Sequence, residues 1–213
     1  MITKNQIKLI KSLRLKKNRI LSGFFIAEGE KIVDELIESN LETVNVFSIS
    51  EKYKSLENYI PIKMSQLKQI SNLKSPNIVL GIFKIPNQTE IDFNSNIIAL
   101  EDINDPGNLG TIIRLCDWFN IKRIICSKNS VDCYNPKVIQ SSMGSFSRVN
   151  VFYEDLDKVF KDNIKVIGTT SNQMMKNDFS KIKRGIILFG NESRGINKKL
   201  EKHINQWISI KKI

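Results

Sequence analysis

Two short runs of the chain are apolar at every position, and they constrain the fold more than any other feature. Residues 97–100 are Ile-Ile-Ala-Leu, and residues 186–189 are Ile-Ile-Leu-Phe. A strand with one solvated face alternates apolar and polar side chains, whereas a strand in a parallel sheet with both faces covered is apolar throughout. Segments of helical spacing separate these runs from other short apolar runs. The sequence therefore predicts an α/β domain with a parallel sheet between layers of helices.

The remaining periodicity predicts two domains, joined at the polar, turn-rich segment 85–89. Residues 1–88 are expected to form a small α/β domain, and residues 89–213 the parallel-sheet domain. In the first we expect helices over 2–15, 31–38 and 65–72, the last capped by Ser65, and strands over 24–27, 44–49 and 78–83. In the second we expect strands over 97–100, 123–126, 149–152, 165–168, 185–189 and 207–210, and helices over 109–120, 137–143, 156–160 and 197–203.

Several classes of protein are excluded by composition. No apolar run approaches the roughly 18 residues of a membrane span, and the first residues lack the apolar core of a signal peptide. The three cysteines are an odd number without C-x-x-C spacing, so neither a disulfide framework nor a metal site is expected. The cytoplasm is the expected compartment.

The charge is unevenly distributed. Lys and Arg exceed Asp and Glu by 33 − 22 = 11, and residues 1–19 hold seven basic residues and no acidic one. Such a block attracts a polyanion, with nucleic acid the first candidate and a membrane surface the second. A solvated helix face is the alternative explanation, which charge alone does not exclude.

Unusual loops follow two of the predicted strands, where open parallel sheets bind their ligands. Residues 101–108 contain Pro and Gly and lead into a helix with Asn108 near its start and Arg114 six residues later. A helix N-terminus beside a guanidinium suits a phosphate or a ribose. Alternatively, Asn108 only caps the helix and Arg114 is a surface charge. Either explanation fits this loop taken by itself.

The second loop, Gly190–Gly195, leaves an apolar strand with one glycine on each side of Glu192. Glycine permits close approach of a ligand to the backbone, and the carboxylate accepts hydrogen bonds from hydroxyl or amine groups. An ordinary strand-to-helix turn is the alternative. A third strand end, near Thr169, is polar but less specific. The glycine patterns of a Rossmann dinucleotide site and of a P-loop are both absent. His203 is expected at the surface, and Cys116 in the core.

Together these segments resemble a known family. The stretch DPGNLGTIIRLCDWF and the stretch FGNESRG are similar to the first and second motifs of the SpoU/TrmH RNA 2′-O-ribose methyltransferases, of the SPOUT superfamily. Residues 25–31 resemble the start of that family's L30e-like substrate-binding domain. The resemblance implies a trefoil-knotted domain, S-adenosylmethionine as cofactor, RNA (rRNA or tRNA) as substrate, and a homodimer.

The resemblance also implies roles for individual residues. The catalytic positions are Arg114, Asn108 and Glu192, with Arg114 acting either as the base or as a clamp on the adjacent phosphate. Cofactor contacts are expected from Thr169, Gly190, Asn191, Gly195 and Ile210. No metal is implied. The residues expected to contact RNA are Lys11, Arg14, Lys16, Lys17, Arg19, Lys137 and Arg148.

One departure concerns the family's third motif. Residues 207–210 match its start, but Lys211 stands where the family has Pro, and the motif's Ser and Asn are absent from the 213 residues. This departure leads us to expect that the 213-residue form binds the cofactor weakly or not at all and lacks methyl-transfer activity. A non-catalytic RNA-binding protein on the same scaffold is therefore the alternative function.

Overall fold

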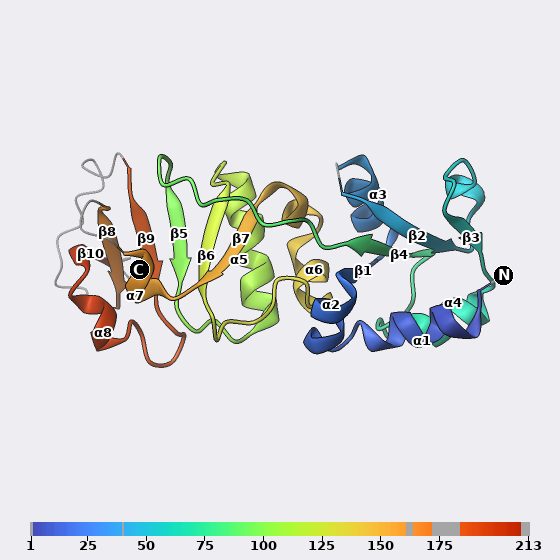
Figure 1. The fold of residues 1–213 in the computed structure, drawn as a ribbon, viewed down its shortest axis with the longest axis horizontal. Coiled ribbons are helices and arrows are strands. Elements are labelled where there is room, and N and C mark those ends of the chain that lie inside the picture. The colour runs from blue at the N-terminus through green and yellow to red at the C-terminus, as the bar shows by residue number, and fades with distance from the viewer. Residues whose placement is uncertain (1, 40, 161–163, 172–183, 210–213) are drawn as a thin grey trace. The chain divides into compact units, whose positions relative to one another are not determined.

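A computed structural model describes residues 2–39, 41–160, 164–171 and 184–209. The chain forms two compact units (Figure 1). Unit 1 comprises residues 1–87 and 132–147, and unit 2 comprises residues 88–131 and 148–213. The segment 132–147, which the sequence places in the second predicted domain, thus packs within unit 1.

Unit 1 is built on a four-stranded sheet in the order β1-β4-β2-β3. β4 is antiparallel to β1 and β2, and β3 is parallel to β2. The strands are β1 (Phe24–Glu28), β2 (Thr43–Ser48), β3 (Tyr59–Pro61) and β4 (Val79–Lys84). The helices are α1 (Lys4–Ser12), α2 (Lys16–Ser22), α3 (Glu30–Glu38), η1 (Glu51–Tyr53), α4 (Met64–Ile70) and α6 (Pro136–Ser142). A further 3-10 turn, η2, spans Ser145–Arg148.

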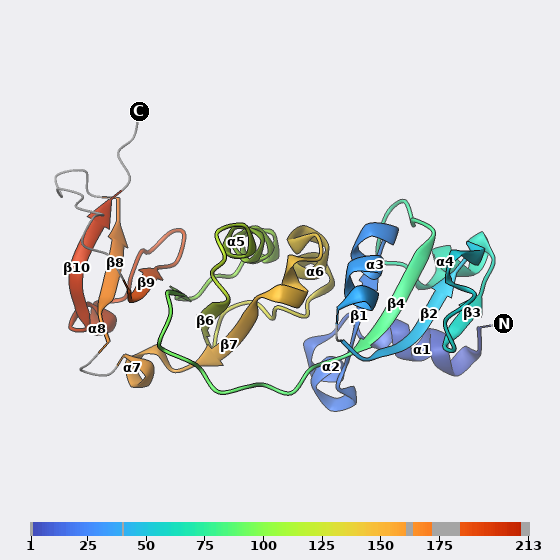
Figure 2. The same cartoon turned by 90° about the horizontal axis from the view of Figure 1, so that it is seen from above.

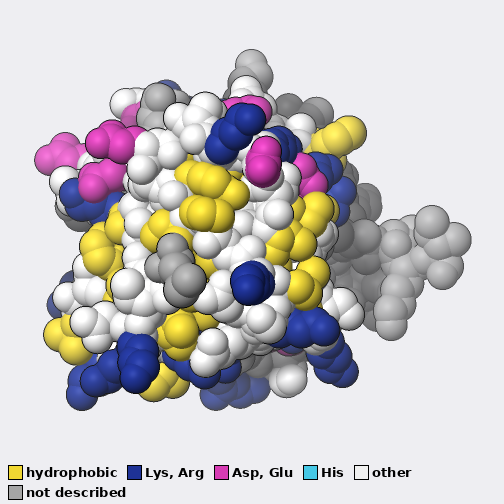
Figure 3. Space-filling view, turned by 90° about the vertical axis from the view of Figure 1, so that its right-hand side faces the viewer, with side chains coloured by type: hydrophobic (Ala, Val, Ile, Leu, Met, Phe, Trp, Pro, Cys, Tyr) yellow, Lys and Arg dark blue, Asp and Glu magenta, His cyan; other side chains and the backbone are white. Residues whose placement is uncertain are grey.

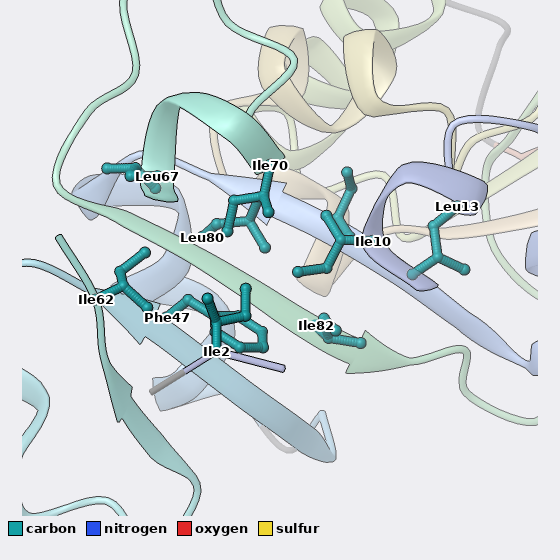
Figure 4. Close-up of a cluster of buried hydrophobic side chains, with 10 residues drawn as sticks. Ile2, Ile10, Leu13, Phe47, Ile62, Leu67, Ile70, Leu80 and Ile82 are labelled. Carbon is teal, nitrogen blue, oxygen red and sulfur yellow. The ribbon is translucent and has the colours of Figure 1, made fainter. Parts of the chain in front are cut away.

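The core of unit 1 lies between the sheet and the adjacent helices α1 and α4 (Figure 1, Figure 4). Ile10 of α1, Leu67 of α4 and Phe47 of β2 are fully buried there. The capping box formed by Thr3 and Gln6 begins α1. The sequence predicts one helix over 2–15, but α1 ends at Ser12 and α2 follows as a separate helix.

One smaller prediction for unit 1 is also corrected, and one strand was missed. The helix expected over 65–72 begins at Met64 with Lys63 as its N-cap, so Ser65 lies in the first turn and does not cap it. The short strand β3 is not predicted, because three residues carry too little periodicity to be recognised.

Two kinds of contact hold the segment 132–147 within unit 1. The ring of Phe25 in β1 lies 5.3 Å from that of Tyr134 and 5.6 Å from that of Phe146. The guanidinium of Arg19 in α2 forms an ion pair with Asp132, and its Nε donates at 2.9 Å. An aromatic cluster and a buried ion pair thus bring the helix α6 beside β1.

Unit 2 is built on a six-stranded sheet in the order β10-β8-β9-β5-β6-β7, and every pair is parallel. This confirms the predicted parallel sheet. The strands are β5 (Ile97–Leu100), β6 (Arg123–Ser127), β7 (Asn150–Glu154), β8 (Val166–Thr170), β9 (Ile186–Phe189) and β10 (Ile204–Ser209). The helices are α5 (Pro106–Trp118), α7 (Leu156–Val159) and α8 (Lys198–Glu201).

Helices cover both faces of this sheet, as the apolar runs predict. Ile97 and Ala99 of β5 share one buried cluster with Leu156 of α7 and Leu200 of α8. Ile98 points to the opposite face, where α5 lies (Figure 2). The trefoil knot stays a prediction, because the segment that would complete it lies beyond Ser209, outside the described residues. None of the described helices is both long enough and apolar enough to cross a membrane.

Candidate active site

The two motif loops meet at the carboxyl ends of β5 and β9, which are neighbouring strands. The loop after β5 leads into α5, which carries Asn108, and the loop after β9 carries Glu192. Asn108 Nδ2 donates a hydrogen bond to Glu192 Oε1 at 3.1 Å. Two residues 84 positions apart in the sequence are therefore joined at the edge where parallel sheets bind ligands.

The start of α5 shows which residue caps this helix. Asp105 is the N-cap, and its side chain accepts from the backbone N–H of Asn108 at 2.9 Å. Pro106 occupies the first helical position, where its missing N–H costs nothing. Since Asp105 performs the capping, the side chain of Asn108 is left to contact Glu192. Asn108 is therefore not the helix cap.

The loop after β9 is a tight turn that requires its glycines. Asn191 and Gly195 exchange two backbone hydrogen bonds, of 3.0 and 2.9 Å. A Cβ on Gly190 would lie 2.1 Å from the carbonyl carbon of Gly195, and Gly195 itself has φ +69°. Asn191 Oδ1 accepts from the N–H groups of Ser193 and Arg194. The turn thus presents Glu192 in a defined position, with Asn191 Nδ2 3.3 Å from Glu192 Oε2.

Asp102 connects the two loops, and sequence reasoning missed it. It has φ +50°, which is uncommon outside glycine. Its carbonyl accepts from Asn191 Nδ2 at 2.8 Å, and its carboxylate accepts from Ser127 Oγ at 2.8 Å. Arg194 Nη2 lies 3.7 Å from the same carboxylate. The sequence feature that could have identified Asp102 is its position directly after an apolar strand. Its neighbour Glu101 is buried, which raises the pKa of that carboxyl.

Arg114 is not brought to the Asn108–Glu192 pair. It lies on α5 six residues after Asn108, which places it about 120° around the helix axis. Its side chain is exposed and makes no hydrogen bond or ion pair with any residue that the structure describes. The guanidinium is therefore available to a ligand or to another chain.

The predicted cofactor residues lie at adjoining strand ends, because β10, β8 and β9 are neighbours in the sheet. Thr169 is the penultimate residue of β8. Its Oγ1 donates a hydrogen bond of 3.0 Å to the carbonyl oxygen of Leu188 on the neighbouring strand β9. Gly190, Asn191 and Gly195 form the turn after β9. Ile210 lies outside the described residues. The described groups include a hydroxyl, an amide side chain and backbone at a glycine turn, which suit the amine and hydroxyl groups of a nucleoside.

An apolar cavity of about 460 Å³ adjoins the pair, with Asn108 and Glu192 among its lining residues. Its walls include Leu115 of α5, Phe119 directly after that helix and Phe189 at the end of β9. These three side chains are 52%, 68% and 37% exposed. Trp118, also on α5, is 84% exposed. The outer face of α5 is thus unusually apolar for a surface.

The basic residues predicted to contact RNA divide into two groups. Lys11, Arg14, Lys16, Lys17, Lys137 and Arg148 are exposed. Arg148 nevertheless pairs with Asp117, its Nε donating at 2.9 Å. Figure 3 shows one face of the molecule, on which Lys and Arg side chains gather along the lower edge and acidic side chains at the upper edge.

Arg19 is the exception to the predicted phosphate contacts. It is 2% exposed, and its guanidinium binds Asp132 and the carbonyls of Leu13 and Arg14. A side chain so enclosed is unavailable to a phosphate, so its expected RNA contact is corrected to a structural role. The sequence alone could not show that Arg19 is buried and Lys17 exposed, because a run of basic residues does not indicate which side chain points into the protein.

Other titratable groups of the described residues do not extend the site. His203 is 20% exposed, and its Nε2 lies 2.8 Å from Asp157 Oδ1. Cys116 is buried as predicted, and burial raises the pKa of its thiol to about 12. Among the described residues, no three His, Cys, Asp or Glu side chains are grouped so as to hold a metal ion.

Comparison with known proteins identifies the family. The SpoU rRNA Methylase family matches residues 95–212, and the MRM3-like substrate binding domain matches residues 4–81. The 23S rRNA (guanosine(2553)-2′-O)-methyltransferase RlmP of Bacillus subtilis is 25% identical over 205 residues, covering 91% of this chain and 82% of that protein. The chain spans 34–40% of the length of the vertebrate mitochondrial rRNA methyltransferases that it also matches.

Solved structures agree with this assignment. A TrmH-family protein of Porphyromonas gingivalis has a TM-score of 0.88 and 26% identity, covering 100% of this chain and 90% of that chain. An AdoMet-bound rRNA methyltransferase of Sinorhizobium meliloti has the same fold, with a TM-score of 0.84 and 22% identity over 100% of this chain and 88% of that chain. More than half of the residues match the family, and both loops carry its motifs. The chain therefore belongs to the SpoU rRNA methylase family.

Proposed function

We propose that this protein transfers a methyl group from S-adenosylmethionine to a ribose 2′-hydroxyl of RNA, with ribosomal RNA as the first candidate substrate. The observation that carries the proposal is the hydrogen bond between Asn108 and Glu192, which joins both motif loops at the ligand-binding edge of the sheet. RlmP, similar over 91% of the chain, is named for this reaction on 23S rRNA.

The residues of the two loops are suited to hold a ribose. Asn108 and Asn191 place amide nitrogens 3.1 and 3.3 Å from the two oxygens of Glu192, so the carboxylate is oriented before a substrate arrives. Each carboxylate oxygen has further lone pairs, which can accept from a ribose hydroxyl. Positioning of this kind supplies much of the rate in a transfer between two bound groups.

The proposed cofactor contacts are Thr169, Gly190, Asn191 and Gly195. The S-adenosylmethionine of the Sinorhizobium meliloti relative supports this cofactor, as do the adjoining strand ends of the present sheet. When bound, S-adenosylmethionine supplies the methyl group. The glycine turn contributes backbone groups that no side chain obstructs.

We further propose a homodimer formed through the outer face of α5. Leu115, Trp118 and Phe119 expose large apolar side chains close together in the sequence there, and exposed apolar surface marks interaction sites. Arg114 borders this surface on the same helix. A second copy packed against α5 would remove water around Arg114. The charge of Arg114 would then act more strongly on a bound phosphate or ribose.

The free cysteines support the cytoplasm as the compartment.

The experiment is methylation of ribosomal RNA with isotope-labelled S-adenosylmethionine, followed by separation of ribose-methylated from base-methylated nucleosides. Arg114→Ala should lower the single-turnover rate by about 10²–10⁴, the usual range for general acid–base assistance. Arg114→Lys should rescue little, since an ammonium lacks the planar fork of a guanidinium. Lys54→Ala is the control, because Lys54 is an exposed cation on unit 1.

Each alternative outcome has a definite meaning. A methyl group found on a base would refute the ribose assignment. Near-normal turnover by Arg114→Ala would refute the role of Arg114. RNA binding without cofactor binding or methyl transfer would instead establish the non-catalytic alternative.

A further inference from the structure

Unit 1 contains a cleft that no residue of the two methyltransferase motif loops lines. It has a volume of about 390 Å³ and lies where β1, the loop after α4 and the helix α6 meet. Arg14 and Lys137 both line it, although 123 residues separate them in the sequence. The cleft exists because the segment 132–147 packs within unit 1.

Its walls combine three kinds of group with one buried carboxylate, that of Glu28. The cations are Arg14 and Lys137, and the neutral hydrogen-bonding side chains are the amides of Asn72, Asn135 and Gln140. Ile26, Leu73 and Pro136 contribute apolar surface. Cations suit a phosphate, amides suit the edge of a nucleobase, and apolar surface suits its flat face. Pockets of this size hold small ligands.

The cleft is rigidly supported on one side. Arg14 Nη2 donates to Ser71 O at 3.0 Å, which fixes the guanidinium and leaves its other N–H groups free to point elsewhere. The buried carboxylate of Glu28 accepts from the Ser71 hydroxyl and from the backbone N–H of Asn72, the latter at 2.9 Å. These bonds hold the loop that presents Asn72 and Leu73 to the cleft.

We propose that this cleft binds a single nucleotide of the RNA substrate, its phosphate at Arg14 and Lys137 and its base at Asn72 and Gln140. The proposal rests on the proposed function in that it takes RNA as the partner. It goes further by assigning unit 1 a nucleotide-binding site separate from the methyl-transfer residues. Amides read base edges, whereas a purely electrostatic surface does not distinguish bases. The site therefore contributes to the choice of RNA sequence.

The test uses the full chain and four five-nucleotide single-stranded RNA probes, one for each base, with affinities measured by fluorescence anisotropy. Arg14→Ala should weaken binding of every probe by about tenfold and lower the salt slope by about 0.7. Asn72→Ala and Gln140→Ala should weaken the preferred probe by about 3- to 10-fold, the effect of removing one hydrogen bond, and leave the salt slope unchanged. Lys54→Ala, which removes a charge outside the cleft, should leave the base preference unchanged.

A second measurement locates the nucleotide directly. A probe carrying 4-thiouridine should crosslink under ultraviolet light to the peptides containing Leu73 or Pro136, and Arg14→Ala should abolish those crosslinks. Crosslinks confined to other peptides, or equal effects of the amide variants on all four probes, would overturn the proposal. Neither readout needs methyl transfer. Failure of the methylation assay with these crosslinks retained would therefore refute the proposed function and leave the cleft assignment standing.

Discussion

The ion pair between Arg19 and Asp132 predicts a large and specific loss of stability. Arg19 is 2% exposed and Asp132 12% exposed, so water screens the pair little. Arg19→Met keeps most of the side-chain volume but leaves the Asp132 carboxylate uncompensated and two backbone carbonyls without their donor. Removing one partner of a buried ion pair costs about 3–5 kcal/mol. We expect the free energy of unfolding to fall by that amount.

Urea unfolding followed by far-UV circular dichroism measures the change. Both tryptophans, Trp118 and Trp207, belong to unit 2, so their fluorescence follows that unit separately. Lys17→Met, which replaces an exposed cation of the same helix, should change stability by no more than about 0.5 kcal/mol. Arg19→Met combined with Asp132→Asn should cost less than the sum of the single changes, since the two residues are in contact. A decrease below about 1 kcal/mol for Arg19→Met would refute the reasoning.

Two further predictions concern surfaces. Replacing Lys11, Lys16 and Lys17 with Gln should flatten the dependence of log K for RNA on log salt, as measured by filter binding. The slope should fall by about 0.7–0.9 for each phosphate that the protein no longer neutralises. An unchanged slope would move the phosphate-binding surface toward Lys137 and Arg148. Trp118→Asp should bury a charge at the interface and so convert the proposed dimer to a monomer of 24.5 kDa, as measured by light scattering. If the unsubstituted protein is itself a monomer, the proposed dimer is contradicted.

Most of the secondary structure could be predicted because the apolar periodicity is strong. The run Ile97–Leu100 coincides with β5, and the run Ile186–Phe189 with β9. Predictions failed where local signals compete. Leu13 and Leu15 extend the helical spacing of α1, yet the helix ends at Ser12, and the buried Leu13 precedes a second helix. The packing of Leu13 in the core is a tertiary effect, which spacing along the chain does not record.

The candidate site was predictable in its motif residues and not in what supports them. Asn108 and Glu192 were identified from their motifs, and the structure joins them by a hydrogen bond. Asp102 was missed because its place between the loops depends on a positive φ and on a contact with Asn191, 89 residues away. Arg14 and Lys137 were recognised as basic residues, but sequence offers no measure of their proximity. Long-range placement of this kind becomes visible only in three dimensions.

The division into units explains why a linear boundary near residue 88 describes this protein incompletely. The chain leaves unit 1 after residue 87, returns at residue 132 and leaves again after residue 147. Tyr134 and Phe146 then cover Phe25, and Asp132 neutralises Arg19. Without that return, unit 1 would bury an unpaired guanidinium and would lack one wall of the nucleotide cleft. The strands that flank the returning segment, β6 and β7, belong to the parallel sheet. Completion of unit 1 therefore depends on a segment that the second domain supplies.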